Sequence, residues 1–552
     1  MRRLLVVPVV VSLGLLATSC SGGSDFAKSD PIPSPSAAEN GFGCEQEFDG
    51  CPGEVGSPLG PVTIPHAVPG GTVTVLTHDG LAGTLDPSGA DQPDVVSLLS
   101  GLVTRSLTQY RYDPLREQMV LVPDLATNLG RHNDDYTLWE YNLRPGVRFE
   151  DGTKVTPDDV VRGIRRCGAG RAFATSPCLT HEPIVSVTEG RRRTIRFTFA
   201  HPFPDLPYLA ATPAIGPVPP GTSFEHGPYA QHPMATGPYR VEKYRRGRLL
   251  VLERNPAWNP RTDPGRTQYP DRYVVRSGIA SDEIAAVLAA DTGDGTTTLT
   301  YDDVPVTPAD RRDWRQHRLV LGGTPCTTYL APDSRTVTDP AVRRALVLAY
   351  PYRAVLRAQG LVPGVTAVPA TNLLPPGVPA RTALTVAGHD GFATEPSAAR
   401  RLLAGAGALG TLLRFSSIPG DPVSLRTRVA LVRSLRAAGF DPEPVRGTPV
   451  DLRTATECGA WPTGAEWLRP VYRSIRLAGP SLEHRMRVIE RLPLDQMPAP
   501  WNRLDRDVMR HRQPVVPLWY GGVAMQHGSR IQGMADDTVL GMPTWGTLWV
   551  SP

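Results

Sequence analysis

The residue types that usually perform catalysis or bind metals are present in this sequence, but no familiar spacing connects them. The chain contains no GxSxG elbow, no Walker loop, no HExxH pair and no CxxC motif. His226 and His232 come nearest to a metal pair, yet no carboxylate or cysteine accompanies them at ligand spacing. Isolated histidines are mostly structural or surface residues. We therefore expect no enzyme activity, no bound metal and no other cofactor.

Cys20 is the first of the seven cysteines and follows an export signal. Arg2 and Arg3 precede an apolar run from Leu4 to Leu16, which is short for a membrane-spanning helix. We expect residues 1–20 to be a lipoprotein signal, cleaved before Cys20 after a diacylglyceryl group joins its sulfur; palmitate is the expected acyl chain. An ordinary secretory signal is the alternative. The Ser-Gly-Gly-Ser run at 21–24 suits a flexible tether.

Six cysteines remain once Cys20 carries lipid, and an even number in an exported chain predicts disulfides. They are Cys44, Cys51, Cys167, Cys178, Cys326 and Cys458. Cys44 and Cys51 are close enough in sequence for a local bond. Six cysteines allow fifteen connectivities, so the sequence by itself leaves the remaining pairs open.

Length and composition set the scale of the fold. A chain of 552 residues is too long for one core, so two or three lobes are expected. Hydrophobic residues at 40% and charged residues at 20% are ordinary for a globular protein. A net charge of +4 is small for this length and implies no nucleic-acid partner. Residues 21–70 are rich in Ser, Pro and Gly and are expected to form a flexible linker.

The most regular stretch runs from Val122 to Val160. Aromatic and aliphatic residues alternate between Tyr136 and Leu143, which predicts a strand. A Pro-Gly turn follows, and Thr156 before Pro157 then predicts a helix N-cap with proline in the first turn. Other patterns predict a strand at 72–76, a helix over 95–107, two strands within 185–199, a hairpin over 236–256 and a helix capped by Asp339.

The sequence of this stretch resembles that of the extracellular solute-binding proteins of family 5, the peptide- and nickel-type receptors of ABC importers. Val122 to Ala126 reads VPDLA, and Leu143 to Val160 resembles the family phrase LRPGVxFxDGTxVTxxDVV. Further matches follow in the family's order at 71–87, 236–241, 339–346, 395–403, 431–440 and 514–518. The resemblance covers the chain from about residue 70 to its end.

The resemblance implies an α/β fold of the periplasmic-binding-protein type (class II, cluster C), with two large lobes and a smaller extra lobe around a ligand cleft. Lobe I would comprise 70–106, 233–324 and 516–552, lobe II 107–232 and lobe III 325–515. Hinges would lie near Cys326 and Pro514, with the ligand between lobes I and III. The resemblance also supports a long-range disulfide between Cys326 and Cys458, and we pair Cys167 with Cys178.

The ligand is less well specified than the fold. Peptide receptors of this family carry an aspartate shortly after the position of Cys458, and it pairs with the peptide's α-amine. Here Ala460 or Gly464 occupies that place, depending on the alignment, and Glu466 is the nearest acid. Our ligand-binding candidates are Asp91, Trp461, Glu466, Trp467, Trp519 and Tyr520. The aromatic candidates suit sugars, apolar side chains or cations, and core packing is the alternative for each.

The resemblance implies a monomeric, lipid-anchored receptor on the extracytoplasmic face of a Gram-positive, actinobacterial membrane. It would capture an oligopeptide or peptide-like solute by hinge closure and deliver it to an ABC permease. A different solute on the same fold, such as a nickel chelate or an oligosaccharide, is one alternative. A non-transport lipoprotein that regulates cell-envelope assembly through protein contacts is another.

Overall fold

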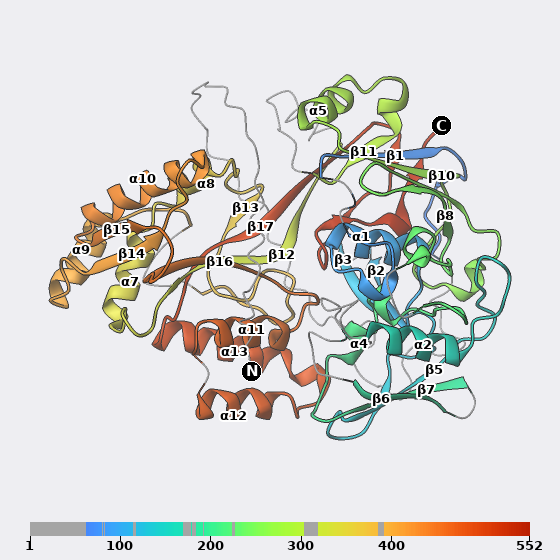
Figure 1. Cartoon of the computed structure of the whole chain (residues 1–552), viewed down its shortest axis with the longest axis horizontal. Coiled ribbons are helices and arrows are strands. Elements are labelled where there is room, and N and C mark those ends of the chain that lie inside the picture. Colours follow the sequence, from blue (N-terminus) through green and yellow to red (C-terminus); the bar gives the residue numbers. More distant parts are fainter. Residues whose placement is uncertain are drawn as a thin grey trace, which may run out of the picture.

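One mixed sheet of eleven strands runs through most of the molecule (Figure 1). The computed structural model describes residues 62–552 apart from 80, 82, 114–116, 169–177, 179–183, 191–192, 224–226, 303–317, 385–390 and 478. The strand order is β15-β14-β16-β12-β17-β11-β1-β10-β9-β8, with β13 beside β17. The strands are β1 (Thr72–Thr77), β8 (Tyr239–Arg245), β9 (Leu249–Arg254), β10 (Arg272–Ser277), β11 (Thr298–Thr300), β12 (Leu319–Pro332), β13 (Ala367–Pro369), β14 (Leu412–Ser416), β15 (Asp441–Val445), β16 (Leu452–Cys458) and β17 (Val516–His527).

The antiparallel pair β12 and β17 joins the two ends of this sheet. Both strands are long, with 14 and 12 residues, and they pair from Leu319↔Gln526 to Leu330↔Val516. Their register shifts between Gly323 and Thr327, next to the position where we expected a hinge. The paired strands β12 and β17 therefore extend from one large half of the molecule to the other.

A smaller sheet, in the order β4-β5-β7-β6, stands apart from the main one. Its strands are β4 (Arg131–His132), β5 (Leu138–Asn142), β6 (Ile184–Glu189) and β7 (Thr194–Phe199), and the hairpin β2 (Thr108–Asp113) and β3 (Gln118–Pro123) lies nearby in sequence. Helix α2 (Pro157–Cys167) begins as predicted: Thr156 and Asp159 form a reciprocal capping box.

The remaining helices pack against the main sheet or share a core with the small one. They include α1 (Pro93–Leu98), α4 (Leu206–Leu209), α5 (Ser281–Ala290), α7 (Pro340–Ala349), α8 (Tyr352–Ala358), α9 (Pro396–Gly405), α10 (Pro422–Ala437), α11 (Gly464–Ser474), α12 (Pro480–Ile489) and α13 (Pro498–His511). Asp339 caps α7 by accepting from the Ala341 amide at 2.7 Å, as predicted. Within the described ranges, no helix combines the length and apolar character that crossing a membrane requires.

The predicted helix over 95–107 is shorter than expected. Helix α1 passes into a single π turn, η2 (Leu99–Val103), and the chain is extended from Thr104 onward. Leu107 is buried as its apolar character suggested, but it directly precedes β2. The predicted strand at 72–76, the two strands within 185–199 and the hairpin over 236–256 are confirmed as β1, β6–β7 and β8–β9.

Three large apolar cores stabilise the described chain. One lies under β1, β8–β10 and the C-terminal segment, and a second lies between α7–α10 and their strands. The third combines the small sheet with α11–α13, so Trp139 and Trp467 belong to one continuous core. The regions we expected to form lobes II and III therefore pack directly against each other in this structure.

Both predicted disulfides that lie within the described residues are present. Cys326–Cys458 joins directly paired residues of β12 and β16, with a Cα–Cα distance of 4.1 Å. Cys167–Cys178 ties the end of α2 to a residue 11 positions later. Cys20, Cys44 and Cys51 lie outside the described residues.

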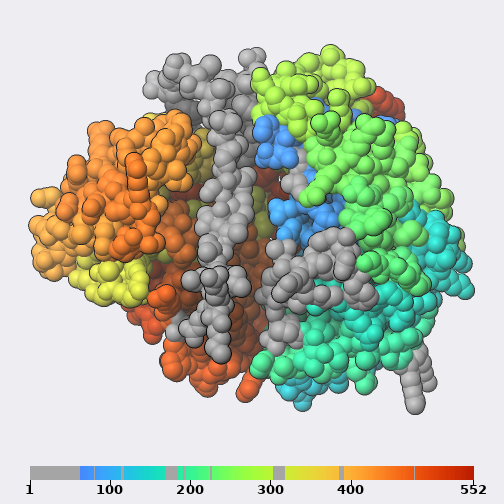
Figure 2. All heavy atoms as spheres, in the orientation of Figure 1, coloured from blue at the N-terminus to red at the C-terminus, as the bar shows by residue number. Residues whose placement is uncertain are grey.

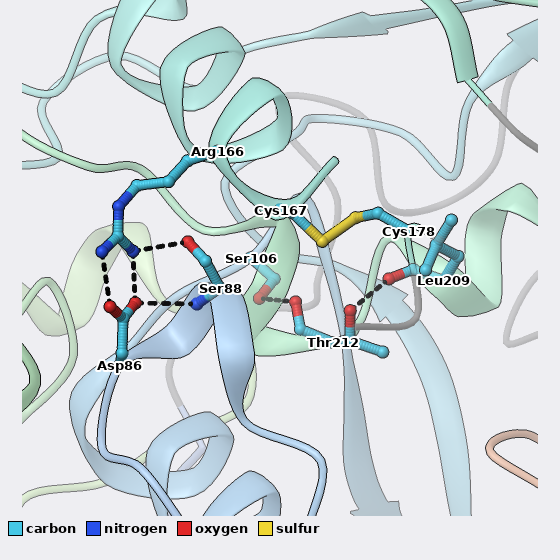
Figure 3. The surroundings of a disulfide bond; sticks show 8 residues. All are labelled: Asp86, Ser88, Ser106, Arg166, Cys167, Cys178, Leu209 and Thr212. Atoms are coloured by element: carbon cyan, nitrogen blue, oxygen red, sulfur yellow. Dashed lines mark hydrogen bonds and ion pairs between the residues drawn. A yellow bond between two sulfur atoms is a disulfide. The ribbon is translucent and has the colours of Figure 1, made fainter. Parts of the chain in front are cut away.

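A buried ion pair flanks the second disulfide (Figure 3). The guanidinium of Arg166, the residue before Cys167, binds both carboxylate oxygens of Asp86 and donates to the Ser88 hydroxyl at 2.9 Å. Both ionic side chains are completely buried. Breaking such a pair leaves one charge unpaired in the interior, so it fixes α2 firmly against the Asp86 turn.

Candidate functional site

A cavity of about 80 Å³ lies where segments distant in sequence meet. The β2–β3 hairpin contributes Gln109, Tyr110, Arg111, Tyr112 and Met119. The other lining residues are Val96, Ser97, Ser100, Gly101, Tyr208, Ala211, Thr212, Gly265, Arg266, Ala460, Asp537, Val539, Leu540 and Pro543 to Thr547. Concave sites at domain junctions with a few polar groups are the usual places for solute binding.

The loop that carries Ala460 is fixed on both sides. Cys458 is tied to β12 by its disulfide, and the Gly459 amide donates to the Pro325 carbonyl at 3.0 Å. The Ala460 amide donates to Oε1 of Glu466 at 2.9 Å. Glu466 lies in the first turn of α11, so its carboxylate holds this loop in place.

Arg266 lines the cavity, but its positive charge is already balanced. Its Nη1 lies 2.9 Å from Oδ2 of Asp124 and 3.2 Å from Oδ2 of Asp263. Arg105 binds Asp124 from the other side at 2.7 Å, and all four side chains are buried. Although burial alone would raise the pKa of Asp263, Arg266 and Arg105 hold it well below its usual range. The two arginines and two aspartates balance each other's charge. This network therefore stabilises the fold, and Arg266 does not offer an unbalanced positive charge to a ligand.

Asp537 is the negative group on the cavity wall. Its side chain belongs to strand β19 (Asp536–Asp537), which pairs with β20 (Met542–Pro543), and only 8% of the residue is exposed. Oδ1 accepts from the amides of Val539 at 3.0 Å and Leu540 at 3.3 Å, whereas Oδ2 accepts no hydrogen bond from the described residues. No cation among the described residues forms an ion pair with Asp537, and burial raises its pKa to about 6 against the hydrogen bonds from Val539 and Leu540.

Asp536 next to it is similarly uncompensated. Oδ2 accepts from the Gly323 amide at 3.0 Å, and the buried Oδ1 has no partner in the described part of the chain. Burial raises the pKa of Asp536 to about 7. Buried carboxylates without a cation are costly. Asp536 does not line the cavity, so it is Asp537 that makes this wall receptive to positive charge.

Two hydrogen-bonding groups of the β2–β3 hairpin are also unused. The Tyr110 hydroxyl is buried without a partner among the described residues, and burial raises its pKa well above the usual value. Arg111 donates from Nη1 to the Pro264 carbonyl at 3.2 Å, but its buried Nε has no partner within the described ranges. Arg111 also has no ion pair with a described carboxylate, and burial lowers its pKa. Buried polar groups are normally satisfied, so these atoms mark places for ligand atoms.

The cavity can therefore bind a small molecule of mixed charge. Asp537 accepts hydrogen bonds from a cationic group, and Arg111 offers a cation to an anionic one. Among the described residues, no group of three His, Cys, Asp or Glu side chains is arranged to hold a metal ion. His232 contacts Glu150 at 2.8 Å, and His226 lies outside the described residues.

None of our six sequence-based candidates lines this cavity. Asp91 is exposed and accepts from the Gln92 amide nitrogen at 3.2 Å. Trp461 is buried and donates from its indole nitrogen to Oδ2 of Asp205 at 2.9 Å. Glu466 holds the Ala460 loop, as described above.

The other three aromatic candidates are core residues in this structure, the alternative we named for each. Trp467 packs in the core shared with the small sheet, directly against Gly459, and Trp519 packs in the core beneath α7–α10. The Tyr520 hydroxyl receives the amides of Thr371 and Asn372 at 3.1 Å, and Arg381 lies over its ring at 5.1 Å.

Sequence reasoning missed Tyr110, Arg111 and Asp537. The stretch Thr108 to Asp113 has the composition of an exposed strand, and nothing in it indicates that residues more than 400 positions later complete a cavity. Asp536 and Asp537 are adjacent acids, but the chain also carries such pairs at 134–135 and 158–159, so the pair by itself would not have located the site.

Comparisons with known proteins agree with this architecture. The sequence profile of the bacterial extracellular solute-binding proteins, family 5 (middle region), matches residues 120–457. The probable D,D-dipeptide-binding periplasmic protein DdpA of Escherichia coli is 26% identical over 156 residues, which span 27% of this chain and 30% of that protein. The periplasmic oligopeptide-binding protein OppA of Salmonella typhimurium is 23% identical over 233 residues, or 36% and 43% of the two chains. The aligned stretches thus cover less than half of either relative.

Solved structures resemble nearly the whole chain. The clavulanic acid biosynthesis oligopeptide binding protein 2 matches with a TM-score of 0.75 and 25% identity, over 94% of this chain and 100% of that one. The unliganded open form of the periplasmic murein tripeptide binding protein MppA matches with a TM-score of 0.70 and 17% identity, over 89% of this chain and 99% of that one. These matches confirm the predicted α/β periplasmic-binding fold, and the profile spans more than half of the sequence. The chain belongs to the bacterial extracellular solute-binding proteins, family 5.

Proposed function

We propose that this chain is the receptor of an ABC importer and binds a small peptide-like solute with a protonated amine in the cavity described above. The observation that carries the proposal is Oδ2 of Asp537, which has no partner among the described residues and belongs to a carboxylate that is buried yet faces the cavity. The names of DdpA, OppA and the two similar solved structures describe binding proteins for peptides, which supports this solute class.

Residues of different charge in the cavity would bind different groups of the solute. Asp537 would accept hydrogen bonds from the amine, and the Tyr110 hydroxyl would bind a neighbouring polar atom of the solute. Arg111 would bind a carboxylate or carbonyl through its free Nε. Charge-assisted bonds of this kind, made in a site without water, are stronger than neutral ones. Asp537 would thereby replace the aspartate that peptide receptors carry near Ala460.

Movement of the lobes proposed from the sequence would let a solute enter the cavity. A cavity of about 80 Å³ is well below the roughly 300 Å³ of a typical ligand site, so a peptide-sized solute needs the walls to separate. The register shift in β12 between Gly323 and Thr327 is a natural place for hinge bending. We propose that lobe I (70–106, 233–324, 516–552) moves against lobe III (325–515), with 107–232 as the extra lobe.

The remaining steps concern the membrane. We propose that Cys20 carries the lipid anchor, that residues 21–70 form the tether, and that the closed receptor delivers its solute to a membrane permease. A monomer is sufficient for this mechanism, because all proposed ligand contacts come from one chain.

The proposal is tested with the exported form that begins after Cys20. Native mass spectrometry, compared with the mass after denaturation, reveals a co-purified solute, and fragmentation identifies it as a peptide, sugar or chelate. Calorimetric titration of that solute is then repeated with Asp537→Asn, which keeps the shape of the side chain but removes its charge. The expected loss of affinity is roughly 30-fold or more, corresponding to about 2 kcal/mol for a buried charged pair.

Asp91→Asn is the matched control, since it makes the same chemical change at an exposed residue outside the cavity. Unchanged binding by Asp91→Asn is expected. Loss of binding by Asp91→Asn with none by Asp537→Asn would refute the proposed site. No co-purified solute, together with no thermal shift in peptide, sugar and nickel-chelate libraries, would instead favour an envelope-regulating role.

A further inference from the structure

The four helices α7–α10 carry an unusual distribution of charge. Every charged residue within these helices is an arginine, so they contain no Asp, Glu or Lys. The whole chain has a net charge of only +4, which means that positive charge is concentrated here. In Figure 1 these helices form one end of the molecule's long axis, and Figure 2 shows the same segments as a projecting end.

Two of these helices lie side by side and share an outer surface. Arg426 in the second turn of α10 donates to the carbonyl of Ala358 at the end of α8, at 3.2 Å. Ser434 near the other end of α10 donates to the carbonyl of Ala349, just before α8 begins, at 2.6 Å. The two helices are therefore antiparallel neighbours.

The outward side chains of this pair combine positive charge with apolar groups. The arginines are Arg353, Arg357, Arg426, Arg433 and Arg436, all exposed. Leu425 and Val429 are 47% and 59% exposed, and they lie one turn apart on α10; Ile418, just before the helix, is 58% exposed. We call these eight residues the α10 face.

The arginines of the α10 face are not neutralised locally. None of them forms an ion pair with a described residue. The carboxylates next to α10 in sequence are Asp421 and Asp441. Asp421 accepts from the Ser424 amide at 2.6 Å and thereby caps α10, and the exposed Asp441 begins β15 after the helix; neither forms an ion pair with these arginines. Clustered cations without counter-ions repel one another, so the surface is suited to an external anion.

We propose that the α10 face docks on an anionic phospholipid surface, with the arginines on lipid phosphates and Ile418, Leu425 and Val429 among the acyl-chain ends. Basic helices that expose aliphatic side chains beside arginine are typical of binding in the membrane interface. Arginine binds phosphate through its planar guanidinium while its long stem lies along apolar groups. An acidic protein surface would pair with the arginines but would offer no apolar contact to the three exposed aliphatic side chains. A lipid offers both a phosphate and acyl chains, so it is the better match.

This docking is distinct from solute binding. The α10 face lies on the outside of the helices that cover the core beneath α7–α10, whereas the cavity lies among the β2–β3 hairpin, Ala460 and the segment 537–547. Membrane contact would set the orientation of the proposed lobe III against the bilayer, and it acts in addition to any lipid on Cys20.

The test is co-sedimentation of the chain from residue 21 onward with vesicles. Vesicles containing half phosphatidylglycerol are expected to bind it, and pure phosphatidylcholine vesicles are not. The combined substitution Arg353→Gln, Arg357→Gln, Arg433→Gln and Arg436→Gln, which leaves the Arg426 bond between α8 and α10 intact, is expected to lower the partition coefficient by roughly 100-fold or more, because each surface arginine contributes about fivefold. Salt at 1 M should abolish binding, since it reduces the Debye length to about 3 Å.

A matched control removes the same charge from another surface. Arg487, Arg491, Arg503 and Arg510 are exposed on or beside α12 and α13, and their replacement by glutamine is expected to change the partition coefficient by less than about threefold. Because all eight arginines are exposed, both sets of variants should keep the wild-type thermal unfolding. An equal loss of binding in the control would show a nonspecific charge effect and would overturn the proposal.

The aliphatic residues separate a lipid from an acidic polymer. Leu425→Ser with Val429→Ser is expected to weaken vesicle binding by about tenfold and to leave binding of polyglutamate unchanged. Polyglutamate binding as tight as vesicle binding, with no effect of the two serine substitutions on either, would assign the α10 face to an acidic protein instead. No binding to anionic vesicles would overturn the proposal outright.

Discussion

Asp205→Asn is expected to stabilise the protein at neutral pH, although it removes a carboxylate that accepts two hydrogen bonds. Asp205 lies just before α4, and its Oδ2 accepts from the Trp461 indole nitrogen at 2.9 Å and from the Thr463 hydroxyl at 2.6 Å. The contact joins residue ranges that we assign to lobes II and III. Only 8% of Asp205 is exposed.

The magnitude follows from the pKa of this carboxyl. Burial raises it from 3.8 to about 6, against the opposing effect of the hydrogen bonds from Thr463 and Trp461. The folded protein therefore holds a proton on Asp205 more tightly than the unfolded chain does. Stability from this group is highest below pH 4 and is lost as the pH rises to about 6, and the loss amounts to roughly 3 kcal/mol at neutral pH.

The assay is urea unfolding, followed by tryptophan fluorescence, at pH values between 3.5 and 7.5. Other buried acids, including Asp536 and Asp537, titrate in the same range, so the informative quantity is the difference between wild type and Asp205→Asn. We expect a difference near zero at pH 3.5. It should rise to about 3 kcal/mol in favour of the asparagine variant at pH 7.

Asp205→Ala separates charge from hydrogen bonding. It leaves the buried indole N–H of Trp461 and the Thr463 hydroxyl without their acceptor, at a cost of about 1–3 kcal/mol for each group. The alanine variant should therefore be less stable than the asparagine variant at every pH. A pH-independent difference between wild type and Asp205→Asn would refute the raised pKa. An asparagine variant less stable than wild type at pH 7 would show that hydrogen bonds to the charged carboxylate outweigh its burial.

Three further outcomes are expected. Tyr110→Phe should leave stability unchanged or slightly higher, because the hydroxyl is buried without a described partner, and it should weaken solute binding about tenfold by calorimetry; a clear loss of stability would mean that the hydroxyl has a structural partner. Replacing Cys326 and Cys458 by alanine opens a loop with a sequence separation of 132, so denaturant unfolding should show a loss of about 5 kcal/mol; an unchanged midpoint would contradict this. Cys20→Ser should move the chain from the membrane fraction to the soluble fraction after cell lysis in 1 M salt, which releases the electrostatic contact proposed for the α10 face, and retention in the membrane would rule out Cys20 as the main anchor.

The sequence predicted those parts of the fold that depend on local chemistry. Thr156 with Pro157, and Asp339 with Pro340, marked helix starts correctly, because a side-chain cap and a proline act within one turn. The end of the helix that starts at Pro93 was predicted less well. Its apolar spacing continues to Leu107, but the backbone leaves the helix after Val103 and Leu107 is buried from an extended segment.

The candidate site was harder to predict because it depends on tertiary contacts. Trp461 and Trp467 were reasonable aromatic binding residues from their composition and position, yet the core shared with the small sheet surrounds both. Tyr110 and Asp537 come together only because β17 brings the C-terminal segment back beside the start of the chain. No local sequence pattern in either segment predicts this tertiary contact.

The pairing of β12 with β17 also determines the order in which the chain can fold. Leu319 pairs with Gln526, so about 200 residues of chain must be made before this ladder can form. Contacts so distant in sequence form slowly, whereas β14, α10 and β15 lie within 34 consecutive positions and can assemble early. Before β17 is made, β12 can pair only with β16, through Cys326 to Pro332, so the first part of β12, from Leu319 onward, has to wait for its partner strand. Because β12 and β17 unite the two halves, the main sheet is completed only after β17 has been made.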